Sequence, residues 1–184
     1  MNPTLNILGI SGSLRAQSRN TGLLRFAKQC LPPTVNFQIA DLADVPFYNA
    51  DHCDSKPESV QTLIRQVTEA DALVLACPEY NYSIAPALKN ALDWVSREPD
   101  CAPVNGKPVA IMGAGGGMGT SRAQYHLRQV CVYLNLRPVN KPEVFSNAFS
   151  ASFNESGDLI DPSLQQQVTA LMNALLAWHS QLTK

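Results

Sequence analysis

Residues 5–20 read LNILGISGSLRAQSRN, and the rest of the chain is interpreted outward from this stretch. Residues 5–10 are mostly apolar and predict a short buried strand, whereas residues 11–20 are small, polar and basic. Residues 21–31 then place apolar side chains at helical spacing. The polar stretch is therefore predicted to lie between the carboxyl end of a strand and the amino end of a helix.

This position predicts an anion-binding loop. The N–H groups of a helix's first turn have no intrahelical partner and carry the positive end of the helix dipole. Serine hydroxyls and the guanidinium of Arg15 can donate hydrogen bonds to phosphate oxygens. The Gly-Lys-Ser/Thr signature of nucleoside-triphosphate loops and the glycine fingerprint of dinucleotide loops are both absent. The sequence therefore favours a terminal monophosphate, and a serine-rich turn that only caps the helix is the alternative.

The composition is that of an ordinary globular chain. With 184 residues, a formal net charge of −1 and no run of five basic residues, the sequence predicts one domain and argues against nucleic acid as a partner. No apolar run is long enough to span a membrane and no secretory signal is recognisable, which predicts a cytoplasmic protein without membrane insertion. The five cysteines are widely spaced, with no Cys-x-x-Cys, which favours reduced thiols.

Strand and helix patterns alternate along the chain. Further strands are expected at residues 35–40, 71–77, 108–113 and 139–146, and helices at residues 57–70, 86–97, 121–134 and 162–182. The stretch 71–77 is apolar on both faces, as in the middle of a parallel sheet. Alternating strands and helices joined by right-handed crossovers predict a three-layer α/β sandwich, with a five-stranded parallel sheet and helices on both faces.

Three unusual loops follow the first, third and fourth of these strands. They are residues 11–20, the aromatic and polar residues 78–83, and the glycine-rich residues 113–119. In a flavodoxin-like strand order these loops share the edge where parallel sheets bind ligands. Glycine in the third loop lets the backbone approach something flat or adopt special dihedral angles, and simple flexibility is the alternative.

Other polar residues give weaker signals. Asp41 follows the second strand, and we interpret it as a loop or cap residue, because the glycine fingerprint that would place a ribose beside it is absent. Residues 51–54 offer four potential metal ligands in a row, but adjacent side chains cannot all turn to one centre, so no metal site is predicted. His52, His126 and His179 lie outside the three loops, and no catalytic side chain is predicted.

Two motifs resemble those of a known family. Residues 12–15, Gly-Ser-Leu-Arg, with Ser18 and Asn20, resemble the G-S-L-R-x-x-S-x-N phosphate loop of the NADPH-dependent FMN reductase family. Residues 78–83, PEYNYS, with residues 88–94, LKNALDW, resemble its second motif. The similarity runs over residues 5–145 and, within the family, is strongest to bacterial quinone and chromate reductases. The chain departs from them in residues 113–119, which are richer in glycine.

The resemblance implies that residues 1–184 form a single flavodoxin-like FMN-binding domain, with NADPH or NADH as co-substrate. The phosphate of FMN would contact Ser11, Ser13, Leu14, Arg15, Ser18 and Asn20. Its isoalloxazine ring would lie against Pro78, Glu79, Tyr80 and Asn81, near Ser83, with the backbone of Ala114, Gly115, Gly116 and Gly117 at its pyrimidine end. For Glu79 and Asn81 the alternative role is loop structure and helix capping, and for Tyr80 it is packing.

The activity that the resemblance implies is transfer of reducing equivalents from NAD(P)H through FMN to a quinone, or to a chromate, azo, nitro or free flavin acceptor. The family also implies a homodimer or homotetramer, in which Arg122, Tyr125 and Glu143 match positions used between subunits; an exposed helix face is the alternative. Arg15, Arg19 or a partner residue would select the 2′-phosphate of NADPH. A flavodoxin-type electron carrier and a nucleotide-binding module without turnover are the alternative functions.

Overall fold

The computed structural model describes residues 5–184, so residues 1–4 of the expected 1–184 domain lie outside the described residues. A parallel sheet runs in the order β2-β1-β3-β6-β7, and β8 pairs with the same edge of β6 further along. Its strands are β1 (Leu5–Ser11), β2 (Val35–Ile39), β3 (Ala72–Ala76), β6 (Pro108–Gly115), β7 (Arg137–Pro138) and β8 (Val144–Asn147). The predicted five-stranded parallel sheet is confirmed, because β7 and β8 share the fifth position, with Pro142 between them.

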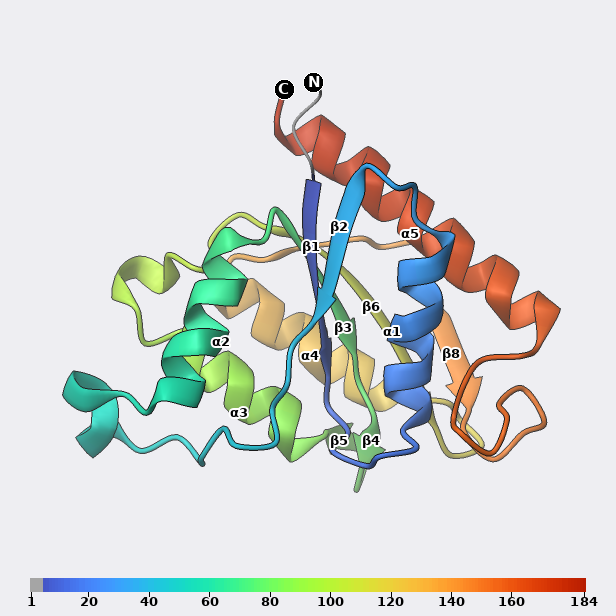
Figure 1. The fold of residues 1–184 in the computed structure, drawn as a ribbon, viewed down its shortest axis with the longest axis horizontal. Coiled ribbons are helices and arrows are strands. Elements are labelled where there is room, and N and C mark those ends of the chain that lie inside the picture. Colours follow the sequence, from blue (N-terminus) through green and yellow to red (C-terminus); the bar gives the residue numbers. More distant parts are fainter. Residues whose placement is uncertain (1–4) are drawn as a thin grey trace.

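Helices cover both faces of this sheet, as predicted. Figure 1 shows α1 (Arg19–Cys30) beside the long α5 (Pro162–Leu182). On the other face lie α2 (Glu58–Glu69), α3 (Pro86–Val95) and α4 (Ser121–Tyr133). Each helix lies within a few residues of its predicted range, so the alternation of patterns was sufficient to predict the three layers.

The core consists of two clusters, one on each face of the sheet. Side chains alternate along a strand, so Ile7 of β1 packs into the cluster with α1 and α5, whereas Leu8 packs into the cluster with α2, α3 and α4. Strand β3 is buried along its whole length and contributes to both clusters. This central position of β3 confirms the prediction drawn from its apolar sequence.

The structure differs from the sequence prediction at two places that matter for the site. Residues 78–83 were predicted to form a loop, but they contribute to a small antiparallel hairpin of β4 (Glu79–Tyr80) and β5 (Ser83–Ile84). The hairpin is possible because Asn81 and Tyr82 adopt positive φ angles of 49° and 67°, as a tight hairpin turn requires. Strand β6 also continues to Gly115, two residues beyond its expected end at Gly113.

Short 3-10 helices occupy the remaining connections. One, η1 (Ala50–Ser55), lies in the polar connection before α2, and the other, η2 (Pro99–Cys101), follows α3. Asp41 accepts a hydrogen bond from the backbone N–H of Ala43 at 2.9 Å, in agreement with its interpretation as a loop residue. Within residues 5–184, no helix is both long enough and apolar enough to cross a membrane.

Candidate functional site

The three unusual loops meet at one cavity, beyond the carboxyl ends of β1, β3 and β6. We call residues 11–20 the phosphate loop, residues 79–84 the hairpin, and residues 113–119 the glycine loop. The cavity is lined by Ser13, Arg15, Ser18, Arg19, Asn20, Pro78, Glu79, Tyr80, Ala114, Gly115, Gly116, Ala148 and Phe149. Segments far apart in sequence therefore converge at one edge of the sheet, as the predicted strand order requires.

The phosphate loop packs tightly against the start of the hairpin. A Cβ atom at Gly12 would lie 2.8 Å from Cδ of Pro78, so only glycine allows the two segments to approach this closely. Ser18 is the N-cap of α1, and its hydroxyl accepts a hydrogen bond from the N–H of Thr21 at 3.1 Å. The hydroxyl of the buried Ser11 accepts from the N–H of Ser13 at 3.2 Å. These two buried serines thus shape the loop from within.

Asn20 joins the phosphate loop to the glycine loop. Its side-chain oxygen accepts from the N–H of Ala114, and its side-chain nitrogen donates to the carbonyl of Ala114, both at 2.9 Å. Because this amide is buried, the paired hydrogen bonds fix the separation of the two loops. One amide N–H of Asn20 remains outside this pairing.

The two guanidinium groups of the phosphate loop, those of Arg15 and Arg19, form no ion pair within residues 5–184. Arg15 is exposed at the rim, between this cavity and a neighbouring one lined by Asp41. Nε of Arg19 is buried, and no hydrogen-bond partner for it exists within residues 5–184. The acidic residue of the cavity, Glu79, is already paired with Arg122. The cavity therefore has cationic donors without a matching anion, which suits a phosphate group.

The hairpin, by contrast, is fastened to α4 through Glu79. The carboxylate of Glu79 accepts from the backbone N–H groups of Arg122 and Ala123, both at 3.2 Å, and from Nε of Arg122 at 2.6 Å. It thereby caps α4, because Thr120 occupies the N-cap position but makes no side-chain cap bond. The guanidinium of Arg122 also lies 3.6 Å from the ring centroid of Tyr82.

The glycine loop contains two kinds of glycine. A Cβ atom at Gly115 would lie 2.4 Å from the carbonyl oxygen of Gly119, so internal packing requires glycine there. A Cβ atom at Gly116 would meet no protein atom within 4 Å, and Gly116 does not adopt a positive φ. Neither packing nor dihedral angle accounts for glycine at Gly116, which lines the cavity. The bare backbone of Gly116 leaves room for a ligand to approach closely.

Five of the residues that the sequence assigned to the cofactor lie outside the cavity lining, and one of these is Gly117 of the glycine loop. Ser11 and Leu14 line the neighbouring cavity beside Asp41, and Asn81 forms the hairpin turn. The hydroxyl oxygen of Ser83 lies 3.0 Å from Nδ1 of His126, and Ser83 lines a third cavity, between α3 and α4. The side chains of these four residues therefore shape the surroundings of the cavity, and none of them lines it.

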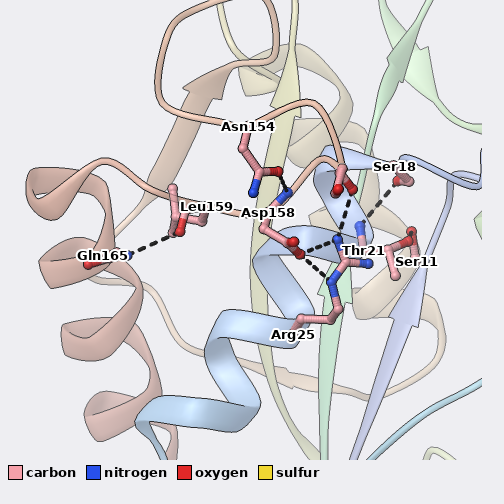
Figure 2. Close-up of polar contacts among 9 residues, drawn as sticks. Ser11, Ser18, Thr21, Arg25, Asn154, Asp158, Leu159 and Gln165 are labelled. Carbon is pink, nitrogen blue, oxygen red and sulfur yellow. Dashed lines mark hydrogen bonds and ion pairs between the residues drawn. The ribbon is translucent and has the colours of Figure 1, made fainter.

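Sequence reasoning did not assign Ala148 and Phe149 to the site, nor Arg19 to the cofactor. Phe149 is 79% exposed at the cavity and follows β8. The segment after it returns to α1, where the carboxylate of Asp158 accepts from Nε of Arg25 at 2.6 Å, as Figure 2 shows. A Cβ atom at Gly22 would lie 1.8 Å from the carbonyl oxygen of Gly157, so the segment touches α1 directly. Residues 148–149 themselves are placed beside the cavity by the pairing of β8 with β6, which a hydrogen bond from the N–H of Ala148 to the carbonyl of Gly115 at 2.7 Å continues.

The cysteines provide no reactive thiol at the site. All five are free. Cys77 precedes the hairpin and Cys131 lies in α4. Burial raises the pKa of each of these two thiols to about 12. Residues 5–184 contain no group of three or more His, Cys, Asp or Glu side chains placed to bind a metal ion.

A flavodoxin-like strand order with a polar, serine-rich loop between β1 and α1 is typical of nucleotide-binding α/β proteins. The sequence pattern of the NADPH-dependent FMN reductase family matches residues 5–151, and the chain belongs to this family. A relative named NAD(P)H-dependent FMN reductase, from Pseudomonas aeruginosa, is 44% identical over 180 residues, which cover 97% of each chain. A quinone reductase of Escherichia coli is 36% identical over 179 residues, which cover 95% of each.

A solved structure agrees with this assignment. FerB, a flavoenzyme NAD(P)H:(acceptor) oxidoreductase from Paracoccus denitrificans, superimposes with a TM-score of 0.86 at 26% identity and covers 96% of this chain and 98% of its own. The protein is thus an enzyme, an FMN-dependent NAD(P)H oxidoreductase with a flavodoxin-like fold. The family membership expected from the two motifs is confirmed.

Proposed function

We propose that the cavity between the phosphate loop, the hairpin and the glycine loop is the FMN site, and that quinones are the electron acceptors. The supporting observation is that Arg15 and Arg19, which form no ion pair within residues 5–184, line one cavity together with the unobstructed backbone of Gly116. A phosphate needs the donors, and a flat ring needs the close backbone approach. The acceptor class follows from the relatives named quinone reductases.

In this proposal each segment has a separate task. The hydroxyl of Ser13, the guanidinium of Arg15 and the first-turn N–H groups of α1 bind the phosphate, with Ser18, Asn20 and the Leu14 amide completing the loop. Pro78, Tyr80 and the hairpin backbone border the isoalloxazine ring, with Asn81 and Ser83 holding the hairpin's shape. The backbone of residues 114–116 borders the opposite part of the ring.

FMN, when bound, supplies the redox chemistry by taking reducing equivalents from NAD(P)H and releasing them to the acceptor. The chain positions the cofactor and leaves one side of the cavity accessible, and no side chain is required as a nucleophile or general base. Glu79 is unsuited to proton transfer, because both of its carboxylate oxygens accept hydrogen bonds from α4. We assign it to positioning of the hairpin.

We also propose that the chain works as a single domain in a homodimer or homotetramer in the cytoplasm. The free cysteines are compatible with a reducing compartment. Tyr125 is 66% exposed on α4 and is available to a second subunit, whereas Arg122 pairs with Glu79 and Glu143 with Lys141 within the chain. Sedimentation equilibrium would measure the number of subunits, and a monomer at micromolar concentration would refute this assembly.

The FMN site is tested by the double substitution Ser13→Ala and Arg15→Ala. Both side chains line the cavity, and neither takes part in a cap or an ion pair within residues 5–184. Loss of two phosphate contacts is expected to weaken FMN binding about a hundredfold, while riboflavin, which lacks the phosphate, binds as before. Fluorescence titration of the apoprotein measures both. Unchanged FMN affinity would exclude this cavity as the phosphate site.

Turnover is tested by the visible absorption spectrum. Anaerobic NADPH should bleach the flavin bands of the holoprotein, and addition of a benzoquinone should restore them. Bands that bleach but do not return with benzoquinone would leave the FMN site in place and remove quinones as the acceptor class.

A further inference from the structure

We propose that Arg19 is a second guanidinium ligand of the FMN phosphate. Arg19 occupies one of the unspecified positions of the G-S-L-R-x-x-S-x-N motif, so the motif assigns it no role. The inference rests on the FMN site proposed above and identifies which cation lies deepest in that site.

The backbone places Arg19 at the point where an anion would bind. Arg19 is the first residue of α1 and directly follows the N-cap Ser18. The N–H of Thr21 donates to the hydroxyl of Ser18 and that of Gly22 to the carbonyl of Ser18 at 2.8 Å, so the N–H groups of Arg19 and Asn20 are the first-turn donors without a partner within residues 5–184. The Arg19 side chain lines the same cavity as Ser13 and Ser18. Backbone and side-chain donors therefore converge there.

Within the described part of the chain, the Arg19 side chain has no ion pair and no hydrogen bond at Nε, which is buried. Arg25 on the same helix differs, because its guanidinium pairs with Asp158, as Figure 2 shows. Arg122 pairs with Glu79. A buried N–H without an acceptor is costly, and an anionic ligand at this position would supply the acceptor.

Its depth assigns Arg19 to the cofactor rather than to the 2′-phosphate of NADPH. Arg19 is half-buried between the buried Ser18 and Asn20, whereas Arg15 is exposed at the rim. A cofactor that stays bound fills the inner end of the cavity, and a co-substrate that comes and goes approaches from the solvent side. The shared ligand chemistry is a phosphate monoester, and its two sources can be separated by experiment.

The test compares Arg19→Ala and Arg19→Lys with the wild type in apoprotein titrations with FMN and with riboflavin. Arg19→Ala is expected to weaken FMN binding by about tenfold to a hundredfold and to leave riboflavin binding unchanged. Arg19→Lys should recover part of the loss, because it keeps the charge but not the planar fork. Lys28→Ala is the matched control: it removes one exposed positive charge from the far end of α1 and should change neither affinity.

Three outcomes would overturn the inference. One is FMN affinity in both Arg19 variants equal to that of the wild type. The second is an equal loss for FMN and riboflavin, which would indicate a structural role. The third is a changed ratio of the KM values for NADPH and NADH at unchanged FMN affinity, which would assign Arg19 to the co-substrate. A wild-type protein that binds FMN at another site would instead refute the proposed function.

Discussion

The phosphate loop and the hairpin border the same cavity, but their polar side chains have different partners. In the phosphate loop, Nε of Arg19 has no acceptor within the described chain, and Arg15 is exposed. In the hairpin, the carboxylate of Glu79 is bound to Arg122 and the start of α4, and the hydroxyl of Ser83 lies within hydrogen-bond distance of His126. Donors left free are available to a ligand, whereas paired groups hold backbone in place.

This comparison distinguishes polar residues that are available to bind a ligand from polar residues that hold the shape of the site. Similar polar residues in two loops of one site suggest similar roles when only the sequence is considered. The contacts show that the phosphate loop offers side chains, and that the hairpin offers backbone and ring surfaces held by α4. Substitutions in the hairpin should therefore alter stability first, and substitutions in the phosphate loop should alter ligand affinity first.

The largest expected effect is that of Glu79→Ala. The Glu79 side chain is 6% exposed, and its removal leaves Arg122 without its partner and the first turn of α4 without its cap. The free energy of unfolding should fall by about 3 kcal/mol. Glu143→Ala, which breaks the exposed pair with Lys141, is the matched control and should cost less than about 1 kcal/mol. Urea unfolding measures both, and equal losses would show that the hairpin is not fastened through Glu79.

The next largest effect is on the stability of the fold at alkaline pH, and it depends on the thiol of Cys77, which precedes the hairpin. Burial raises the pKa of Cys77 to about 12, whereas an unfolded thiol ionises near pH 8.5, at about the usual cysteine value. Between these values the unfolded chain binds fewer protons than the folded chain, so stability falls as pH rises, by about 1.4 kcal/mol per pH unit for this thiol.

Cys77→Ala should reduce that slope by about 1.4 kcal/mol per pH unit, measured by urea unfolding between about pH 9 and pH 11. Burial lowers the pKa of Lys107, which acts in the opposite direction, but Lys107 is present in both proteins and cancels in the comparison. Arg15→Ala in the phosphate loop should leave the slope of the wild type intact. A slope that Cys77→Ala does not change would mean that this thiol ionises in the folded protein.

The smallest expected change in stability is that of Gly116→Ala. Its new methyl group meets no protein atom, so the free energy of unfolding should stay the same or rise by up to about 1 kcal/mol. FMN affinity should nevertheless fall, because the methyl group occupies the approach to the backbone. Gly115→Ala is the control, since its methyl group would clash with the carbonyl of Gly119, and it should destabilise the fold by about 2 kcal/mol. Full FMN affinity in Gly116→Ala would place the ring elsewhere.

The sequence by itself determined the layers, the sheet and the edge that carries the site. Apolar runs and helical spacing depend on neighbouring residues, so Leu5–Ser11, Ala72–Ala76 and Pro162–Leu182 were predictable within a residue or two. The convergence of the three loops followed from strand order alone.

The tertiary structure alone decided the partner of each polar group. Three contacts join residues more than 30 positions apart: the pairing of Glu79 with α4, the bonds from Asn20 to Ala114, and the bond from Ala148 to Gly115 that places Phe149 beside the cavity. No local pattern encodes such contacts, because they depend on how packed layers bring distant segments together. The sequence marks both Glu79 and Arg19 as candidate site residues. In the structure Glu79 caps α4, whereas Nε of Arg19 has no hydrogen-bond partner within residues 5–184.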